Sequence, residues 1–329
     1  MRKTAPALLA DLLLTACGSA PAPQTGSNSP GTKTPTPVRL TIASLPGLPA
    51  ARSGLGAAMV DGTIWVVGGL TAADTSSSTI WAYSPSQGVT GTWNLPFRTH
   101  DLSAVADGGR VYVVGGGAFT SLDTFGSFAV PPQGSNGATA PFANAGTTPQ
   151  PYSDAWAGMW NGTMTIVGGY NDQTASNRVW QYASGTWGVL ATLPLGIRYA
   201  GVAASPKGLY VVGGFDGNNS GSGSDTSGVY LVTPAGRVTR VATLPQPLER
   251  AGAAVLGNTL YVFGGYDGTS YLSAILALDT STGTWTTVAH LPEPWAYGAM
   301  VQSGSDVYLV GGQNASGPLT TVWAITRRG

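Results

Sequence analysis

The residue types best suited to acid–base chemistry are scarce in this chain. Glutamate occurs only at positions 249 and 293, and histidine only at positions 100 and 290. Glu249 is followed directly by Arg250, so a carboxyl and a guanidinium group are neighbours in the sequence. A carboxyl can act as a general acid or base when it reaches a substrate, and an arginine can hold a carboxylate or hydroxyl group. The adjacency alone assigns no catalytic residue, so a catalytic role for Glu249 and Arg250 is only an alternative.

Arginine, aspartate and aromatic residues recur at matching places along the chain and could together form one pocket. One group comes just before short strands of small residues, and a second comes just after glycine doublets. The first group is Arg52, Arg98, Asp101, Asp154, Trp156, Arg198, Tyr199, Arg250, Trp295 and Tyr297, and the second is Tyr170, Phe215 and Tyr266. Aromatic faces stack on sugars, and arginine binds carboxylates or hydroxyls. The set predicts a site for a carbohydrate or an anionic small molecule. The alternative is that the Arg and Asp side chains pair with one another and fill the centre of the fold.

The composition excludes several other kinds of site. Cys17 is the only cysteine, and the two histidines fall in different parts of the chain, so no Cys/His metal cluster can form. We expect neither a metal nor a cofactor. The 15 Lys and Arg residues balance the 15 Asp and Glu residues, which leaves a net charge of zero. No basic surface is expected to attract nucleic acid.

Six glycine doublets divide the chain into units of similar length. They are Gly68-Gly69, Gly115-Gly116, Gly168-Gly169, Gly213-Gly214, Gly264-Gly265 and Gly311-Gly312, and their first members are 47, 53, 45, 51 and 47 residues apart. Each doublet ends a short apolar run, such as IWVVGG or LYVVGG. A self-similar period near fifty residues is the sequence signature of a repeat architecture.

Each unit carries the signals of four short strands. A strand of small residues, such as 251–255, leads through a tight turn into the apolar strand that ends in the glycine doublet. A third strand with Tyr or Trp follows, and a fourth carries Gly-Thr-Trp in several units. The 48 glycines and 23 prolines suit many short strands and turns rather than long helices. Four strands per unit with repeated glycine and aromatic marks predict an all-β propeller.

The two ends of the chain complement each other. The sixth unit stops after its third strand, at 321–326, while residues 38–43 stand before the first unit as an unattached strand. That strand can complete the last blade and so remove an open sheet edge. We therefore predict a six-bladed propeller over residues 38–329, with the ring closed by the N-terminal strand.

The repeated pattern resembles the kelch repeat. The marks are Gly-Gly after an apolar strand, a downstream Tyr or Trp, and then Gly-Thr-Trp at 91–93, 185–187 and 283–285. The resemblance covers residues 38–329, and the second unit departs most, because its glycines at 115–117 open a long insert. Six-bladed kelch propellers include the periplasmic sialic-acid mutarotases, a family thought to use Glu and Arg in its central site. The resemblance thus implies a catalytic alternative for Glu249 and Arg250.

A second kelch enzyme family fits the chain poorly. The galactose-oxidase-like copper enzymes need His and Tyr ligands and a cysteine in the propeller body. The body of this chain contains no cysteine, and His100 and His290 belong to different units. No copper site is therefore expected.

The first 37 residues differ from the rest. A basic start, Met1-Arg2-Lys3, precedes an Ala- and Leu-rich stretch that ends in Leu14-Thr15-Ala16-Cys17. This stretch resembles a bacterial lipoprotein signal, by which residues 1–17 would be the signal peptide and Cys17 the lipidated residue. Residues 18–37 are rich in Pro, Ser and Gly and read as a disordered tether. The alternative is a cytosolic chain with a chance cysteine.

These observations predict a kelch-propeller lipoprotein of the bacterial cell envelope, anchored to the membrane through lipid alone. Its expected role is to bind a protein or carbohydrate partner through one face of the propeller. The alternatives are a periplasmic sugar-modifying enzyme of the mutarotase type and a purely structural envelope protein. The fold itself does not decide between them, because propellers serve all of these roles.

Overall fold

All regular structure in the described residues is β-strand. The computed structural model describes residues 39–131, 136–137, 139–217 and 223–328. Residues Val38–Gly329 form one compact unit. The predicted signal peptide, Cys17 and the tether lie outside the described residues. No helix in the described part of the chain is long and apolar enough to cross a membrane.

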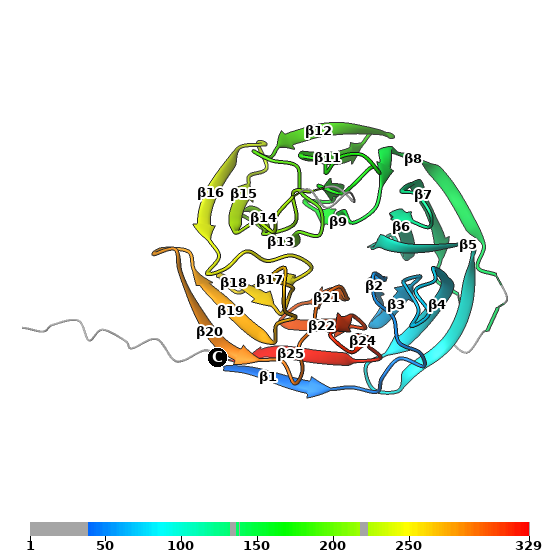
Figure 1. The fold of residues 1–329 in the computed structure, drawn as a ribbon. Helices are drawn as coiled ribbons and strands as arrows, with labels where there is room; N and C mark the ends of the chain where they lie inside the picture. The colour runs from blue at the N-terminus through cyan, green and yellow to red at the C-terminus, as the bar shows by residue number, and fades with distance from the viewer. Residues whose placement is uncertain (1–38, 132–135, 138, 218–222, 329) are drawn as a thin grey trace, which may run out of the picture. The chain divides into compact units, whose positions relative to one another are not determined.

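The strands form antiparallel sheets arranged around a common axis (Figure 1). One sheet is β1 (Arg39–Ser44), β25 (Val322–Arg328), β22 (Asp306–Val310) and β21 (Ala299–Ser303). A second four-stranded sheet contains β9 (Trp156–Trp160), β10 (Thr163–Val167), β11 (Arg178–Ala183) and β12 (Thr186–Thr192). A third contains β13 (Gly201–Ser205), β14 (Gly208–Val212), β15 (Gly228–Val232) and β16 (Val238–Thr243). A fourth contains β17 (Gly252–Leu256), β18 (Thr259–Phe263), β19 (Ala274–Asp279) and β20 (Thr284–His290). A short pair is β23 (Gln313–Asn314) with β24 (Gly317–Pro318). The predicted all-β propeller is confirmed.

The remaining sheet has seven strands and is held together by one long strand. Its order is β2 (Gly56–Val60), β3 (Thr63–Val67), β4 (Ser77–Ser84), β5 (Gly88–Asp107), β6 (Arg110–Gly117), β7 (Leu122–Ala129) and β8 (Phe142–Tyr152). β5 pairs with β4 up to Thr99 and with β6 from His100 onward. One strand therefore serves as the outer strand of one four-stranded set and the innermost strand of the next.

The N-terminal and C-terminal strands of the propeller lie side by side. β1 pairs with β25 along its whole length, from Arg39 opposite Arg328 to Ser44 opposite Trp323. Figure 1 shows β1 on the outside of this sheet, next to the C-terminal end of the chain. The outer edge of β25 is thus covered by a strand from the other end of the chain.

The glycine doublets fit because neighbouring sheets approach closely at their ends. Gly68 has a φ of 64°, in the left-handed region that favours glycine. A Cβ atom added there would lie 2.6 Å from the carbonyl oxygen of Thr99, the last residue of β5 that pairs with β4 before β5 passes to the next set of strands. A side chain at this position would therefore clash with the backbone of β5 at this crossing.

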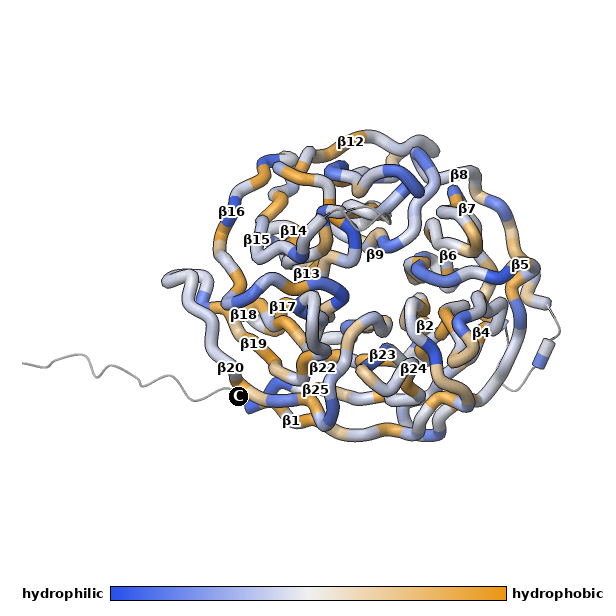
Figure 2. The backbone as a smooth tube through the Cα atoms, in the orientation of Figure 1, coloured by the Kyte–Doolittle hydropathy of each residue, from blue (hydrophilic) through white to orange (hydrophobic). Residues whose placement is uncertain are grey.

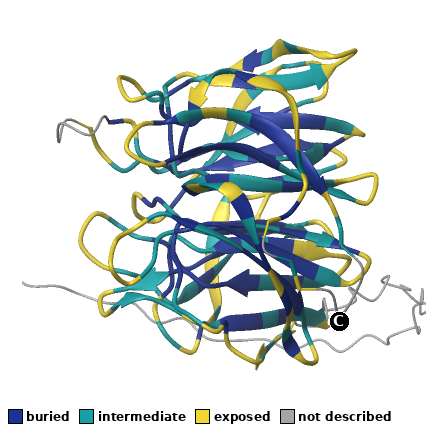
Figure 3. Cartoon of the chain, turned by 90° about the vertical axis from the view of Figure 1, so that its right-hand side faces the viewer, coloured by how far each residue is buried: buried dark blue, intermediate teal, exposed yellow. Residues whose placement is uncertain are grey.

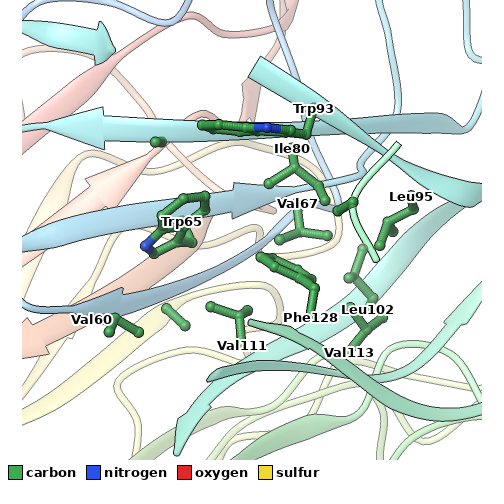
Figure 4. Close-up of a cluster of buried hydrophobic side chains, with 13 residues drawn as sticks. Val60, Trp65, Val67, Ile80, Trp93, Leu95, Leu102, Val111, Val113 and Phe128 are labelled. Atoms are coloured by element: carbon green, nitrogen blue, oxygen red, sulfur yellow. The ribbon is translucent and has the colours of Figure 1, made fainter. Parts of the chain in front are cut away.

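The hydrophobic core lies between neighbouring sheets as separate clusters. In the cluster of Figure 4, the ring centroids of Trp65 and Trp93 lie 5.5 Å apart, and the Phe128 ring meets Trp65 edge-on at 6.0 Å. These large rings fill the space that widens with distance from the axis. Figure 2 shows apolar segments along the strands of every sheet, and Figure 3 shows burial in the sheets and exposure at the loops.

Candidate functional site

A closed cycle of backbone hydrogen bonds surrounds the propeller axis. Six residues form it: Asp101 lies within β5, and each of the others stands two positions before an innermost strand. Each backbone N–H donates to the carbonyl of the preceding member: Gly54 to Tyr297 (2.8 Å), Asp101 to Gly54 (2.6 Å), Asp154 to Asp101 (3.0 Å), Tyr199 to Asp154 (3.0 Å), Arg250 to Tyr199 (2.9 Å) and Tyr297 to Arg250 (3.0 Å). We call these six residues the axial ring. The cycle fixes their backbones relative to one another, which is what a preorganised site requires.

Every residue of the axial ring adopts the left-handed backbone conformation. The φ angles are 55° for Gly54 and 53° to 61° for the other five. This conformation costs an ordinary residue about 1 kcal/mol or more, and only glycine adopts it freely. Five non-glycine side chains are nevertheless kept at these positions.

The axial ring lines a cavity of about 180 Å³, which we call the axial cup. Four consecutive residues from each set of strands form its wall: 54–57, 101–104, 154–157, 199–202, 250–253 and 297–300. Most residues after the ring positions are small, and Trp156 is the only large aromatic side chain among them. The polar groups of the cup therefore come from the ring positions.

A buried ion pair stands on one side of the cup. An Arg198 guanidinium nitrogen lies 3.5 Å from an Asp154 carboxylate oxygen, and both side chains are buried. The Arg198 guanidinium also stacks on the rings of Tyr170 at 4.4 Å and Phe215 at 5.3 Å. Tyr170 and Phe215 thus lie behind the cup and hold Arg198, which in turn holds Asp154.

Two carboxyl groups of the axial ring interact directly. Burial raises the pKa of Asp154 well above its ordinary value, and the charge of Asp101 raises it further. Burial also raises the pKa of Asp101, although hydrogen bonds with Asp154 and Tyr297 act in the opposite direction. Two adjacent buried carboxylates cannot both ionise at low cost, so the pair keeps a proton to a higher pH than an exposed aspartate does. His100 Nε2 lies 3.7 Å from the carboxylate oxygen Oδ2 of Asp101.

Glu249 and Arg250 meet at the opposite side of the ring. Arg250 Nε lies 3.5 Å from Glu249 Oε1, and the guanidinium stacks on the rings of Tyr199 at 4.1 Å and Tyr297 at 4.5 Å. Burial raises the pKa of Glu249 to about 7, although the charge of Arg250 lowers it. Desolvation lowers the pKa of Arg250, but nearby Tyr199 and Glu249 outweigh it and the pKa rises. Arg250 lines the cup, whereas Glu249 lies behind it.

Arg198, Tyr170 and Phe215 are not part of the cup wall, and four more of the residues predicted for the pocket also lie outside it. Arg98 is exposed on β5. Arg52 is buried with its guanidinium 4.9 Å from the Trp81 ring, and Trp295 is a core residue whose Nε1 donates to the Gly311 carbonyl at 2.8 Å. Tyr266 packs against the Tyr271 ring at 5.0 Å, in the loop after its glycine doublet.

Arg52, Arg98 and Trp295 lie outside the cup because of their positions relative to the axial ring. Arg52 and Trp295 stand two positions before the axial ring, and Arg98 stands three before it. Only the left-handed residue of each set and those that follow it line the cup, so residues further upstream lie against or outside the core. Aligning the six units on their glycine doublets would have placed Gly54 beside the five predicted ring residues. The hydrogen bonding between Asp101 and Asp154 leaves no signal in the sequence.

The described residues offer no evident metal site. No group of three or more His, Cys, Asp or Glu side chains in the described ranges is placed to hold a metal ion. The ring residues of the cup carry carboxyl, guanidinium and phenol groups. Together these can donate and accept hydrogen bonds with a small polar ligand.

Similarity to known proteins agrees with this architecture. The kelch motif matches residues 51–95 and 247–292. The chain is 26% identical to a kelch domain-containing protein of Saccharolobus solfataricus, over 71% of this chain and 38% of that protein. It is 28% identical to a kelch domain-containing protein of Pyrococcus furiosus, over 63% of this chain and 62% of that protein. The chain is a kelch-repeat β-propeller.

The kelch propeller also has a solved structural relative. It superposes on the structure of YjhT with a TM-score of 0.67, over 87% of this chain and 99% of that one. The two sequences are 14% identical, so the likeness concerns the fold. The kelch propeller spans less than two thirds of the length of the two archaeal relatives.

Proposed function

We propose that this protein is a cell-envelope lipoprotein whose kelch propeller binds a glycan in the axial cup. The seven-stranded sheet counts as two blades that share β5, which gives six blades in all. The pairing of β1 with β25 closes the ring. Six blades place six ring residues around one axis, so a ligand in the cup can be contacted from every side.

The observation that carries this proposal is the set of side chains at the strained ring positions. Glycine fills one of the six positions, at Gly54, and would fit all of them without strain. The other five carry Asp, Tyr or Arg, although each left-handed residue costs about 1 kcal/mol and buried carboxyls add to that cost. Local features that reduce stability are concentrated at functional sites. A scaffold without a ligand would have no need of them.

The size and chemistry of the cup favour a single sugar residue. Drug-sized ligands occupy pockets of about 300–1,000 Å³, and the cup holds about 180 Å³. Arg250 can donate hydrogen bonds to sugar hydroxyls, while Asp101 and Asp154 can accept them. The glycan would therefore insert one residue into the cup, with the rest of the chain across the face of the propeller.

The envelope location rests on the lipoprotein-like signal and the tether. Replacement of Cys17 by Ser should move the full-length protein from the membrane fraction to the soluble fraction in a bacterial host. Extraction at high salt separates lipid anchoring from electrostatic adsorption, which salt screens. If the Cys17→Ser protein still sediments with membranes at high salt, the lipid anchor is wrong.

Glycan binding is tested by thermal denaturation and calorimetry of the full-length protein. The probes are D-glucose, D-galactose, N-acetyl-D-glucosamine and D-glucuronic acid, followed by a glycan array. A sugar at about 100 times its Kd stabilises the protein by about 2.7 kcal/mol. The Arg250→Ala variant should lose this stabilisation, and the Arg98→Ala variant should keep it because Arg98 is exposed outside the cup. Binding that survives Arg250→Ala, or the absence of any binding, would contradict the proposal.

An enzyme of the sugar mutarotase type is the second candidate. The observation that favours it is Glu249, whose pKa of about 7 suits proton transfer at neutral pH. In ring opening the Glu249 carboxylate would take the proton of the anomeric hydroxyl, the bond between C1 and the ring oxygen would break, and water would give that oxygen a proton. Proton NMR of a freshly dissolved single anomer would show accelerated interconversion. Glu249→Gln should abolish the acceleration and leave sugar binding intact.

A further inference from the structure

A second cavity continues the axial cup along the propeller axis. It has a volume of about 520 Å³ and is lined by all six innermost strands. Trp156, Met300 and several small residues belong to the walls of both cavities. The two spaces therefore meet at one level of the axis, and a ligand in the cup can extend into the larger space.

The side chains of the second cavity differ in character from those of the cup. Met59, Met159 and Met300 line it, which is three of the five methionines in the chain. Each is half-buried, with its inner part packed against the core between blades. Met164, in contrast, is buried in the core. We call this space the methionine chamber. Methionine is flexible and polarisable, so a surface with three of them adapts to apolar groups of different shape.

Trp156 stands at the junction of the cup and the chamber. The position two residues after the axial ring is otherwise small, with Gly56, Ser103, Gly201, Gly252 and Ala299. The Trp156 ring lies over Gly158, where an added Cβ would come within 2.5 Å of a ring carbon. Its indole makes no hydrogen bond to any described residue and is half-buried. An aromatic face at this level can contact the sugar above and an apolar substituent below.

The volumes agree with a ligand in two parts. The cup alone is smaller than the range of about 300–1,000 Å³ that encloses drug-sized ligands, and the methionine chamber lies within it. The charged groups described above are all at the cup, whereas the wall of the chamber combines methionine, alanine and valine side chains with Gln302 and strand backbone and carries no charged side chain. A ligand with a polar end in the cup can thus place an uncharged end against the methionines.

We infer that the methionine chamber is a binding site for the apolar aglycone of a glycoside whose sugar occupies the cup. This inference rests on the proposed glycan binding. It narrows the ligand class from glycans in general to sugars that carry an alkyl or aryl group at the anomeric carbon. Such a ligand spans the junction at Trp156.

The inference predicts that affinity rises with the length of the aglycone. Calorimetry compares methyl and pentyl β-D-glucosides, and methyl and pentyl β-D-glucuronides, on the full-length protein. Full burial of a methylene tightens binding about fourfold, so the four additional methylenes of the pentyl compounds would give at most about 250-fold. With only part of the alkyl chain buried, we expect the pentyl compounds to bind about tenfold more tightly than the methyl ones. Equal affinity for both lengths overturns the chamber and leaves the proposed function intact. Binding of the pentyl compounds without any binding of the sugars overturns the proposed function instead.

NMR of the protein labelled at its methionine methyl groups measures directly where the alkyl group of the ligand lies. The signals of Met59, Met159 and Met300 should shift with the pentyl glycosides and much less with the methyl glycosides. Met164 is the internal control, because it is buried in the core and its signal should not move. Substitution of each methionine by Leu assigns the signals. Chamber signals that stay unchanged while a pentyl glycoside binds overturn the inference.

A variant that changes only the chamber tests its contribution to affinity. The double variant Met59→Gln/Met159→Gln places polar groups in the chamber without touching the cup, and Met164→Leu is its matched control. The double variant should bind the pentyl compounds no more tightly than the methyl ones, with methyl binding unchanged. If the variant does not fold, the measurements on the wild-type protein still decide. A preserved preference for the pentyl compounds contradicts the inference.

Discussion

Tyr297 donates a hydrogen bond from its phenol to the carboxylate of Asp101, across 196 residues of sequence. The two residues are not neighbours in the axial ring, because Gly54 stands between them in the cycle of backbone hydrogen bonds. A Cβ atom added at Gly54 would overlap the Asp101 carboxylate and lie 3.3 Å from the Tyr297 phenol. The missing side chain at Gly54 is thus what lets Tyr297 reach Asp101 over the junction of the first and last blades.

Replacement of Tyr297 by Phe should lower the free energy of unfolding by about 1–3 kcal/mol, because a buried carboxyl loses its hydrogen-bond donor. Urea denaturation at neutral pH measures this loss. Tyr308→Phe is the matched control, since the Tyr308 hydroxyl makes no hydrogen bond to a described residue and its loss should cost little. Equal stability of the two variants would show that the contact between Tyr297 and Asp101 is energetically unimportant.

Replacement of Gly54 by Ala should destabilise the protein more than replacement of Gly62 by Ala. Both glycines are left-handed, with φ of 55° and 76°, so in both variants the backbone strain is about 1 kcal/mol. Only at Gly54 does the new methyl group meet other atoms, because the space around Gly62 is open. The difference between the two variants in urea denaturation therefore isolates the clash with Asp101 and Tyr297. If the two variants lose the same stability, the ring can relax around a methyl group.

The pairing of Asp101 and Asp154 predicts a dependence of stability on pH. The folded protein raises the pKa of Asp154, so the stability contributed by its proton is complete below the ordinary aspartate pKa of about 4 and is lost as pH rises through the folded value. Asp154→Asn removes this titration. The unfolding free energy of the wild type should therefore fall relative to that of Asp154→Asn as pH rises above about 4.

A series of urea denaturations from acid to alkaline pH measures this difference. The control is Asp123→Asn, because the Asp123 side chain is exposed on β7 and its replacement should leave the wild-type curve unchanged. Parallel curves for the wild type and Asp154→Asn would contradict a shared proton in the axial ring.

The sequence predicted the propeller because its signals are local and repeated. The glycine doublets mark places where sheets approach closely, and Gly68 illustrates the steric reason. The pairing of β1 with β25 was also foreseen, since each end of the chain lacked a partner strand. The propeller is predictable because its signals repeat within about fifty residues. The pairing of the two terminal strands is predictable because a count of strands leaves each of them without a partner.

The candidate site was only partly predictable, since it depends on the direction of single side chains. Of the residues that the sequence predicts for the pocket, Asp101, Asp154, Tyr199, Arg250 and Tyr297 line the axial cup. Arg52 and Trp295 were selected with them because a count of residues before a strand does not show which residue turns inward. The residue with the left-handed backbone conformation is the one that turns toward the cup, and no residue type other than glycine indicates this conformation in the sequence. The methionine chamber was missed, because Met59, Met159 and Met300 come from strands that read as ordinary core.

Glu249 should titrate near neutral pH. Burial raises its pKa from 4.5 to about 7, so the stability that its proton contributes is complete below pH 4.5 and lost as pH rises through about 7. Over this range the wild type should lose roughly 1–3 kcal/mol more unfolding free energy than Glu249→Gln loses. Carbon NMR of the protein labelled at glutamate is a clean measurement, because Glu293 supplies the only other side-chain signal.

The ionisation of Glu249 should also change what the cup binds. Above pH 7 its carboxylate lies 3.5 Å from Arg250 and neutralises the cation that an acidic sugar needs. D-Glucuronic acid should therefore bind more weakly at pH 8 than at pH 6, while D-glucose, which carries no charge, should bind equally at both. In Glu249→Gln the affinity for D-glucuronic acid should no longer depend on pH. A dependence that persists in this variant would assign the titration to another group, such as the Asp101 and Asp154 pair.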